Sequence, residues 1–475
     1  MKECPLINLI MKFRRKYTIT SAVVFALIFL SANIYFVQIL FEEKQVHTFK
    51  NVRTEVTNSS KERTPKPKKP LVKHGTIIAI EKIKYKLSQL SSRYYRRKSS
   101  SYSLIKQLQD DLNETVPISI NLLQTADEWA TPNQLVPNPA PVLGSLLRTL
   151  CTSQIRKAEN ARKGTQLKLL LTFDSGWQGV FKPQWYERNE VLWGPSYGGK
   201  DRHNGEVASF HLSLLLGLPR VPITVGRRLH LPLEILPVAD QALHNTFSLN
   251  GSSTCLHGVC LYCTPKEPVC GKTLDGKNGG PYLEGALSLW LPSKLLPLKR
   301  HRSPWQRTYK PGRAAKWEVD KDYCVKIMQD QENQIFREKL LARSRLLDLI
   351  DAAIFDFLIG NGDRHHHETF QPFPNSTVLL IDNGKSFGNP YDDHLDILAP
   401  LYQCCIIRRK TWERLQILSG GVLGEALEIL LRPSHLSPLL TPPHYVALNR
   451  RLLHVYATVE NCLDKDQTNV ILDLI

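Results

Sequence analysis

The sequence predicts an α+β fold of two lobes, in which a small β-rich N-terminal lobe precedes a mainly helical C-terminal lobe. Residues 167–173 and 178–182 are apolar runs joined by Asp-Ser-Gly-Trp, a combination typical of a β-hairpin. Residues 207–216 are amphipathic and follow acidic side chains, as at the start of a helix. A chain of 475 residues, 42% of them hydrophobic, is long enough for one such domain with additional segments.

The N-terminal region predicts a membrane anchor. A basic cluster at 12–16 precedes residues 17–41, which carry no charged side chain. A segment of this length crosses a bilayer with some tilt, and the basic cluster predicts a cytoplasmic tail at 1–16. A cleaved signal peptide is the alternative, although its apolar core would be shorter and would end in small residues. With an uncleaved anchor, the rest of the chain lies in the lumen of the secretory pathway.

Residues 42–140 differ in composition from the rest of the chain. They carry basic runs at 66–69 and 93–98, and prolines are frequent at 132–141. Like charges and prolines disfavour a packed core, so we expect a luminal stem that precedes a folded domain at 141–475. The formal net charge of +18 suits anionic glycans or acidic proteins as partners, because a luminal protein meets little nucleic acid.

The cysteines and glycosylation sequons agree with a luminal domain. Of the ten cysteines, Cys255, Cys260, Cys263 and Cys270 fall in one segment rich in turn formers, and disulfides persist in that compartment. A zinc site is the alternative for the pair Cys260 and Cys263, but the sequence has no second pair at zinc-ribbon spacing. Sequons lie at Asn58, Asn113, Asn250 and Asn375.

The most informative residues are Asp363, in Gly-Asn-Gly-Asp-Arg-His-His-His-Glu, and Asp382, in Leu-Leu-Ile-Asp-Asn-Gly-Lys-Ser-Phe-Gly. Phosphoryl transfer needs one carboxylate that accepts the proton of the attacking hydroxyl and another that holds the metal ion bound to the nucleotide. A largely apolar segment at 346–359 leads to the loop with Asp363, and a strand-like run at 377–381 ends at Asp382. The Asp-Asn-Gly turn resembles the metal-binding loop of kinases, although an Asx-turn would explain it if it stood alone.

The β-rich lobe supplies further charged candidates. Its second apolar run ends in Val-Phe-Lys-Pro, where Lys182 could reach nucleotide phosphates, although a lysine there is more often a surface residue. Asp201 and Glu206 suit either a helix cap or a partner for Lys182. No Gly-x-Gly-x-x-Gly occurs between Gln166 and Lys182, so the phosphate loop of ordinary protein kinases is missing.

Longer motifs occur between residues 164 and 462. They are Val-Phe-Lys182-Pro, Asp201-Arg-His-Asn, Glu284-Gly-Ala-Leu-Ser-Leu-Trp-Leu-Pro, Gly360-Asn-Gly-Asp-Arg-His-His, Asp382-Asn-Gly-Lys-Ser-Phe-Gly and Leu398-Ala-Pro-Leu-Tyr-Gln-Cys-Cys. In this order they resemble the secretory-pathway kinases of the "family with sequence similarity 20" group. Arg302-Ser-Pro-Trp-Gln-Arg-Thr-Tyr, Trp317-Glu and Cys260-Leu-Tyr-Cys are most similar to the branch that phosphorylates a sugar, the glycosaminoglycan xylosylkinases.

This resemblance implies an atypical protein-kinase-like fold with an N-lobe at about 141–287 and a C-lobe at about 288–475. It also implies a role for each matching residue. Asp363 would be the catalytic base, and Asp382 and Asp201 would bind Mn²⁺, with Mg²⁺ as the alternative; hard oxygen ligands select such ions. ATP would contact Asp382, Gln166, Lys182 and Glu368, with Ser288, Leu289, Trp290 and Leu291 as the hinge beside the adenine.

The resemblance further suggests the pairing of the cysteines. The implied disulfides are Cys255–Cys270, Cys260–Cys263, Cys324–Cys404 and Cys405–Cys462. Cys4 would remain on the cytoplasmic side, and Cys151 would be an odd luminal thiol.

The sequence departs from the family pattern beside the base. Gly362 stands where relatives have a larger residue, and its backbone freedom would loosen the loop. His367 stands where a Tyr is usual. The run His365-His-His invites a metal-binding interpretation, but adjacent side chains diverge too much to close easily on one ion, so loop scaffolding and hydrogen bonding are the expected roles.

The function implied by the resemblance is that of a Golgi membrane protein, single-pass type II, with a luminal ATP-dependent glycan kinase domain. Such an enzyme phosphorylates the 2-hydroxyl of xylose in the glycosaminoglycan–protein linkage region of proteoglycans. The alternatives are a protein kinase that acts on Ser of secreted acidic proteins and a pseudokinase that activates a true kinase. A pseudokinase would be expected to lack Asp363, Asp382 or Lys182, and all of them are present.

Overall fold

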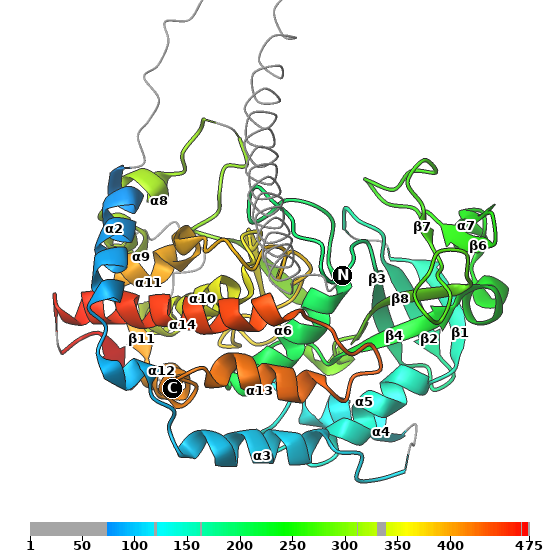
Figure 1. Cartoon of the computed structure of the whole chain (residues 1–475), viewed down its shortest axis with the longest axis horizontal. Coiled ribbons are helices and arrows are strands. Elements are labelled where there is room, and N and C mark those ends of the chain that lie inside the picture. Colours follow the sequence, from blue (N-terminus) through cyan, green and yellow to red (C-terminus); the bar gives the residue numbers. More distant parts are fainter. Residues whose placement is uncertain are drawn as a thin grey trace, which may run out of the picture. The chain divides into compact units, whose positions relative to one another are not determined.

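The structure is a computed structural model that describes residues 74–117, 121–161, 164–310, 312–329, 339–466 and 468–473 (Figure 1). All of them fall within one unit of the chain, Pro70–Ile475. The predicted cytoplasmic tail (1–16), the predicted anchor (17–41) and the first part of the predicted stem lie outside the described residues. No helix among the described residues is long and apolar enough to cross a membrane.

The helices and strands fall into three successive regions of the chain. The first region contains α2 (His74–Ser88), η1 (Ser92–Tyr95), α3 (Ser100–Leu112), α4 (Asn121–Trp129) and α5 (Leu143–Thr152). The second contains β1 (Ile155–Asn160), β2 (Leu169–Phe173), β3 (Gln178–Pro183), α6 (His203–Leu215), β4 (Thr224–His230), η2 (Leu231–Ile235), η3 (Leu236–Val238), α7 (Gln241–His244), β5 (Phe247–Asn250), β6 (Ser253–Leu256), β7 (Val269–Cys270) and β8 (Tyr282–Leu289). The third contains η4 (Ser293–Leu295), β9 (Leu298–Arg302), α8 (Lys316–Val319), α9 (Tyr323–Gln329), α10 (Lys339–Ile359), β10 (His366–Phe370), η5 (Leu395–Leu398), α11 (Ala399–Cys404), β11 (Ile407–Arg408), α12 (Arg409–Ile417), α13 (Val422–Leu431), α14 (Pro442–Leu463) and β12 (Ile471–Leu472).

An antiparallel sheet forms the centre of the β-rich lobe. Its strands lie in the order β1-β2-β3-β8-β4. The predicted hairpin is present, because β2 pairs with β3 from Leu169 opposite Phe181 to Thr172 opposite Gln178. On its other side β3 pairs with β8, which places Lys182 opposite Ala286. The sheet therefore holds Lys182 on an inner strand with neighbours on both sides.

Helix α6 lies between this sheet and the helical lobe. It contacts β4 and β8 on one side and α13 and α10 on the other. Every residue from His203 to Leu215 is buried. The prediction of an amphipathic helix at 207–216 was right about the helix and wrong about an exposed face, because two layers cover it.

The helical lobe is built around α10, α13 and α14, and Figure 1 shows α13 and α14 running beside each other. Helix α10 ends at Ile359, shortly before Asp363, as the apolar segment 346–359 predicted. The predicted strand at 377–381 is wrong in extent: Leu379 forms an isolated bridge with Glu368, and the rest of that segment is not in a strand.

The described part of the predicted stem is folded onto the domain, so the boundary expected at residue 140 differs from the structure. Helix α2 packs against α14, and α3 against α13. Tyr94 is buried and stacks on Tyr456, with ring centroids 4.4 Å apart. Basic side chains of this region pair with acidic ones of the helical lobe, as Lys86 does with Asp464 at 2.8 Å and Arg97 with Glu425 at 2.8 Å. The basic run at 93–98 looked unfavourable for packing because its partners, such as Glu425 for Arg97, lie several hundred residues away in the chain.

The disulfides implied by the resemblance are all present, and they confirm that pairing. They are Cys255–Cys270, Cys260–Cys263, Cys324–Cys404 and Cys405–Cys462. Cys151 is a half-buried free thiol, and Cys4 lies outside the described residues. The sequon asparagines Asn113, Asn250 and Asn375 are exposed.

Candidate active site

Lys182 lies at the centre of a cluster of carboxylates. Its Nζ is 2.5 Å from Oδ1 of Asp382 and 3.4 Å from Oδ2 of Asp201, and it also contacts Oε1 of Glu206. Lys182, Asp201 and Glu206 are buried, whereas the side chain of Asp382 is 62% exposed. The strand β3, the start of α6 and the loop after residue 381 therefore bring these groups together, and Asp382 remains accessible to a ligand.

Close backbone packing fixes the carboxylates of this cluster. The N–H of Arg202, at the start of α6, donates to the carbonyl of Gly384 at 2.7 Å. A Cβ on Gly384 would lie 2.6 Å from Cβ of Asp201, so a larger residue cannot occupy that position without displacing the carboxylate. The glycine of Asp-Asn-Gly is thus required by the approach of the segment that carries Asp201.

The charges of the cluster stabilise one another. Burial lowers the pKa of Lys182, but Asp382, Glu206 and Asp201 raise it by more, so the pKa lies well above its usual value. The Lys182 ammonium lowers the pKa of Asp382 far below its usual range and outweighs the opposing effect of partial desolvation by the surrounding protein. Both groups are therefore charged at neutral pH, and Asp382 is present as the carboxylate that a metal ion requires.

Arg364 connects the loop of Asp363 to the loop of Asp382. Its side chain donates to the carbonyl of Ile381 at 2.7 Å and to Oδ1 of Asn383 at 2.7 Å, which are the neighbours of Asp382 in the chain. The same guanidinium pairs with the buried Asp356 of α10 at 2.6 Å. A buried, paired arginine thus holds the two loops side by side.

The carboxylate of Asp363 has neighbours of its own. The hydroxyl of Tyr309 donates to its Oδ1 at 2.9 Å, and Nδ1 of His365 lies 3.6 Å from the same oxygen. The backbone N–H of Asp363 donates to Oδ1 of Asn361 at 3.1 Å. Burial and the Asp363 carboxylate raise the pKa of Tyr309, so its hydroxyl remains a donor. These contacts orient a carboxylate that is only partly covered.

Gly362 does not loosen this loop, contrary to the sequence-based expectation. Its φ is not in the left-handed region, and a Cβ at this position would lie 1.8 Å from Oγ of Ser196. The N–H of Gly362 donates to the carbonyl of Ser196 at 3.2 Å. The glycine therefore makes room for a neighbouring loop, and that contact restrains the backbone.

The remaining residues expected to contact a nucleotide lie around this cluster. Oε1 of Gln166 accepts from the N–H of Asp201 at 2.8 Å. Glu368, on β10, is half-buried and lies 3.5 Å from Nε of Arg300; burial raises its pKa despite Arg364 and Arg300.

The expected hinge lies at the end of β8 and just beyond it. Ser288 is opposite Val180 of β3, and its Oγ is 2.8 Å from Oγ1 of Thr224. Leu289 is buried, Trp290 is 44% exposed, and Leu291 is half-buried.

The three consecutive histidines have different environments. His365 contacts Asp363, and His366 lies 3.1 Å from Arg300. The expectation of hydrogen bonding is wrong for His367, which is buried with neither ring nitrogen hydrogen-bonded. Burial lowers the pKa of His367 to about 3. No cluster of three or more His, Cys, Asp or Glu residues suited to a metal ion occurs in the part of the chain that the structure describes, so the histidines do not form one.

Several residues of the site were not singled out from the sequence. Nζ of Lys168 lies 3.6 Å from Asp382, and Nζ of Lys385 lies 3.5 Å from Asp201. Tyr309 contacts the loop of Asp363 from a distant part of the chain. Arg364 directly follows Asp363, but nothing in the sequence marks its contacts with the loop of Asp382. Lys385 could have been predicted, because it directly follows the Asp-Asn-Gly turn. The other residues belong to the site through contacts that no local sequence pattern reveals.

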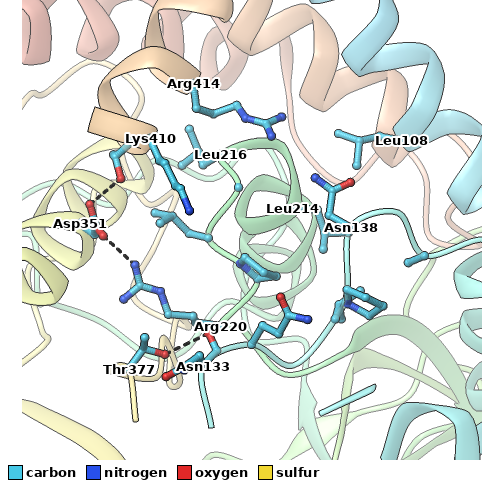
Figure 2. A pocket seen from close by; sticks show the side chains of 18 of the residues that line it. Leu108, Asn133, Asn138, Leu214, Leu216, Arg220, Asp351, Thr377, Lys410 and Arg414 are labelled. Carbon is cyan, nitrogen blue, oxygen red and sulfur yellow. Dashed lines mark hydrogen bonds and ion pairs between the residues drawn. The ribbon is translucent and has the colours of Figure 1, made fainter. Parts of the chain in front are cut away.

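A cavity of about 500 Å³ lies elsewhere, between the loop at 133–140, the end of α6 and α12 (Figure 2). None of Lys182, Asp201, Asp363 and Asp382 lines it. Arg220 enters this cavity and pairs with Asp351 at 2.9 Å, as Figure 2 shows. The buried arginine is thus neutralised by carboxylates of the same cavity wall, which indicates a structural network of ion pairs.

Comparison with known proteins identifies the family. The family model described as "Golgi casein kinase, C-terminal, Fam20" matches residues 121–471. The chain belongs to the Fam20 family.

Curated relatives within the Fam20 family include sugar kinases and protein kinases. The chain is 46% identical to the human glycosaminoglycan xylosylkinase over 343 residues, which cover 72% of this chain and 80% of the relative. The zebrafish protein of the same name is 44% identical, with 79% and 88% covered. The human extracellular serine/threonine protein kinase FAM20C is 37% identical, with 70% and 56% covered.

Solved Fam20 structures share the fold. The structure described as hydra Fam20 with sugar has a TM-score of 0.68 and 40% identity, and it covers 74% of this chain and 99% of its own. The Golgi casein kinase with Mn/ADP bound has a TM-score of 0.67 and 26% identity, with 88% and 96% covered. The described domain therefore has the Fam20 kinase-like fold of mixed helices and sheets.

Proposed function

We propose that this Fam20 chain is an ATP-dependent glycan kinase that phosphorylates the 2-hydroxyl of xylose in the glycosaminoglycan–protein linkage region of proteoglycans. The observation that carries the proposal is the contact of Lys182 with Asp382, beside Asp201 and tied through Arg364 to the loop of Asp363. A lysine, the exposed carboxylate of Asp382 with the buried one of Asp201 beside it, and a third carboxylate on the adjoining loop are the groups that phosphoryl transfer needs.

The residues fit a nucleotide with a divalent ion. Asp201 and Asp382 offer hard oxygen donors that both lie within 3.4 Å of one ammonium nitrogen, so the position already attracts a cation. Asp201 and Asp382 would hold Mn²⁺ or Mg²⁺, and a relative of the same fold was crystallised with Mn/ADP. Such an ion, when bound, neutralises negative charge on the phosphates.

Side chains of the protein would bind the nucleotide and accept the proton of the acceptor hydroxyl. Lys182 would contact the phosphates, with Lys168 close by. Gln166, Glu368 and the hinge at 288–291 would contact the rest of the nucleotide. The Asp363 carboxylate would accept the proton of the sugar hydroxyl, and Tyr309 would keep it oriented.

Xylose is favoured as the acceptor by the relatives. Identity to the human xylosylkinase is 46%, against 37% to the human protein kinase FAM20C. The motif at Arg302 to Tyr309 supports the same choice through its resemblance to the xylosylkinases, and its last residue contacts Asp363.

The test is an acceptor assay with the full-length chain in detergent. We expect phosphate transfer from ATP with Mn²⁺ to a xylose-containing linkage oligosaccharide and little to casein. Asp382→Ala should lose at least about 1,000-fold in kcat/KM, because a metal ligand contributes several kcal/mol to the transition state. Asp275→Ala, an exposed aspartate in a turn, is the matched control. Transfer to casein alone would establish the protein-kinase alternative, and transfer to neither would establish the pseudokinase alternative.

We also propose that residues 17–41 anchor the protein in the Golgi membrane, with residues 1–16 in the cytoplasm and the kinase domain in the lumen. The uncharged segment and the preceding basic cluster support this topology. In selectively permeabilised cells, an epitope at the N-terminus should be accessible to antibody while one at the C-terminus is protected. Accessibility of both would contradict the orientation.

A further inference from the structure

A basic pocket adjoins the candidate active site. It has a volume of about 540 Å³ and is lined by residues from β9, the following loop and α8. We call it the basic pocket; its charged lining residues are Arg300, Arg302, Arg307, Arg313 and Lys316, and no Asp or Glu among the described residues lines it. Such a concentration of one charge indicates an anionic ligand.

Part of this charge has no counterion in the described part of the chain. Arg307 pairs with Asp396, and Arg300 lies near Glu368. Arg302 is hydrogen-bonded to the neutral side chain of Gln306, and the exposed side chains of Arg313 and Lys316 have no carboxylate partner among the described residues. The cavity of Figure 2 differs in this respect, because Asp348 and Asp351 compensate its buried arginines.

The walls of the basic pocket are connected to the loop of Asp363. The N–H of Ser303 donates to the carbonyl of His365 at 2.9 Å, and Tyr309 donates to Asp363 itself. An indole nitrogen fixes the loop between them: Trp317 donates to the carbonyl of Gln306 at 3.0 Å. A ligand in the pocket would therefore lie beside the acceptor position.

The spacing of the cations suits an extended polypeptide. Arg300 and Arg302 alternate along β9, which places both on one face of the strand, about 7 Å apart. Strand β9 pairs with β10, which is the other strand of that sheet. Alternate side chains of an extended peptide have the same separation, so two acidic residues of such a peptide could each meet one guanidinium.

We propose that the basic pocket binds an acidic polypeptide segment next to the sugar-bearing residue of the acceptor. This proposal rests on the proposed function and specifies the part of the acceptor that lies beyond the sugar. Arginine suits carboxylates because its planar fork donates two parallel hydrogen bonds. The enzyme would thus recognise the xylose and the acidic character of the protein that carries it.

The experiment compares acceptors that differ only in the flanking charge. The full-length chain is given a xylosylated peptide with Asp and Glu near the sugar, the same peptide with Asn and Gln instead, a neutral linkage oligosaccharide, and an oligosaccharide ending in a uronic acid. We expect kcat/KM for the acidic peptide to exceed that for the neutral peptide about tenfold, mainly through KM. The advantage should shrink at high salt, because exposed charges are screened.

A charge-reversal variant tests the pocket itself. Arg302→Glu/Arg313→Glu/Lys316→Glu should abolish the preference for the acidic peptide and leave turnover of the neutral oligosaccharide unchanged. The control variant, Lys106→Glu/Arg156→Glu/Lys266→Glu, makes the same charge change at exposed positions on other elements and should keep the preference.

Each other outcome has a defined meaning. Equal kcat/KM for the acidic and neutral peptides, or a preference that survives in the charge-reversal variant, would overturn the proposal. A preference confined to the uronic acid oligosaccharide would overturn it too, because the pocket would then bind glycan. Binding of the labelled acidic peptide, measured by fluorescence anisotropy, gives a readout without turnover. Weaker binding by the charge-reversal variant would support the pocket even if xylose phosphorylation itself failed.

Discussion

Nζ of Lys182 lies 2.5 Å from Oδ1 of Asp382, although 200 residues separate them in the chain. This contact joins β3 to the loop after residue 381 and thereby joins the sheet to the helical lobe. The third group is Glu206, which enters from the first turn of α6. The side chain of Glu206 is only 5% exposed, so it holds Lys182 from within the protein, whereas the carboxylate of Asp382 is exposed.

Replacing Glu206 tests this arrangement. In Glu206→Gln the ammonium loses a charged partner, which costs about 1.5–3 kcal/mol. We expect kcat/KM to fall roughly 10- to 100-fold, with a higher KM for ATP, because Lys182 would shift towards the remaining carboxylates. Steady-state kinetics with varied ATP and Mn²⁺ provide the measurement. Glu190→Gln, at an exposed position, should behave as wild type; a normal KM for ATP in Glu206→Gln would exclude the positioning role.

Removing the Tyr309 hydroxyl tests the orientation of Asp363. Tyr309→Phe deletes a 2.9 Å hydrogen bond to a carboxylate, so we expect kcat to fall about tenfold while ATP affinity is unchanged. Kinetics combined with ATP titration separate the two effects. Tyr391→Phe, an exposed tyrosine, is the control. A loss of ATP affinity in Tyr309→Phe would show that Tyr309 acts on the nucleotide side.

The contact between Gly362 and Ser196 predicts an epistatic pair. Gly362→Ala would place a methyl group 1.8 Å from Oγ of Ser196, so we expect a decrease in both thermal stability and kcat. Ser196→Gly removes the obstructing side chain, and the double variant should recover much of the loss. Additive effects in the double-mutant cycle would mean that the glycine serves another purpose.

Burial of His211 predicts acid sensitivity. Burial lowers the pKa of His211 from 6.5 to about 4. Between these values the unfolded chain binds the proton that the folded protein excludes. The free energy of unfolding should therefore fall as the pH decreases below 6.5, by up to about 1.4 kcal/mol per pH unit for this histidine.

The measurement for His211 is urea denaturation at pH 7 and pH 5. His211→Leu should remove only the part of the pH dependence of the unfolding free energy that His211 contributes. The rest should persist, because burial also lowers the pKa of His444 to about 4. An unchanged slope in His211→Leu would contradict the assignment.

The features that were predictable from the sequence are those set by local patterns. The hairpin of β2 and β3 followed from two apolar runs joined by a turn, and the end of α10 followed from one long apolar segment. Lys182 and Asp382 could be identified as candidate site residues because each stands at the end of a short apolar segment of the sequence.

Other features depend on contacts that no local pattern contains. Glu206 was compatible with a helix cap or with a lysine partner, since both roles require an acid in the first turn. Gly362 suggested flexibility because the loop that packs on it, at Ser196, is more than a hundred residues away in the chain. The segment at 74–140 resembled a stem because its basic residues have no acidic partners nearby in the sequence. In the structure they pair with acidic residues near the C-terminus.

The packing of α2 and Tyr94 against α14 limits how far the chain can be shortened from its N-terminal side. A cut before His74 would leave the helices that cover the helical lobe in place. A cut beyond Tyr94 would remove α2 and uncover the aromatic group of Tyr456 and Trp412, which that tyrosine touches. Any shortened form that stays active should therefore begin upstream of α2, and a shorter product should aggregate.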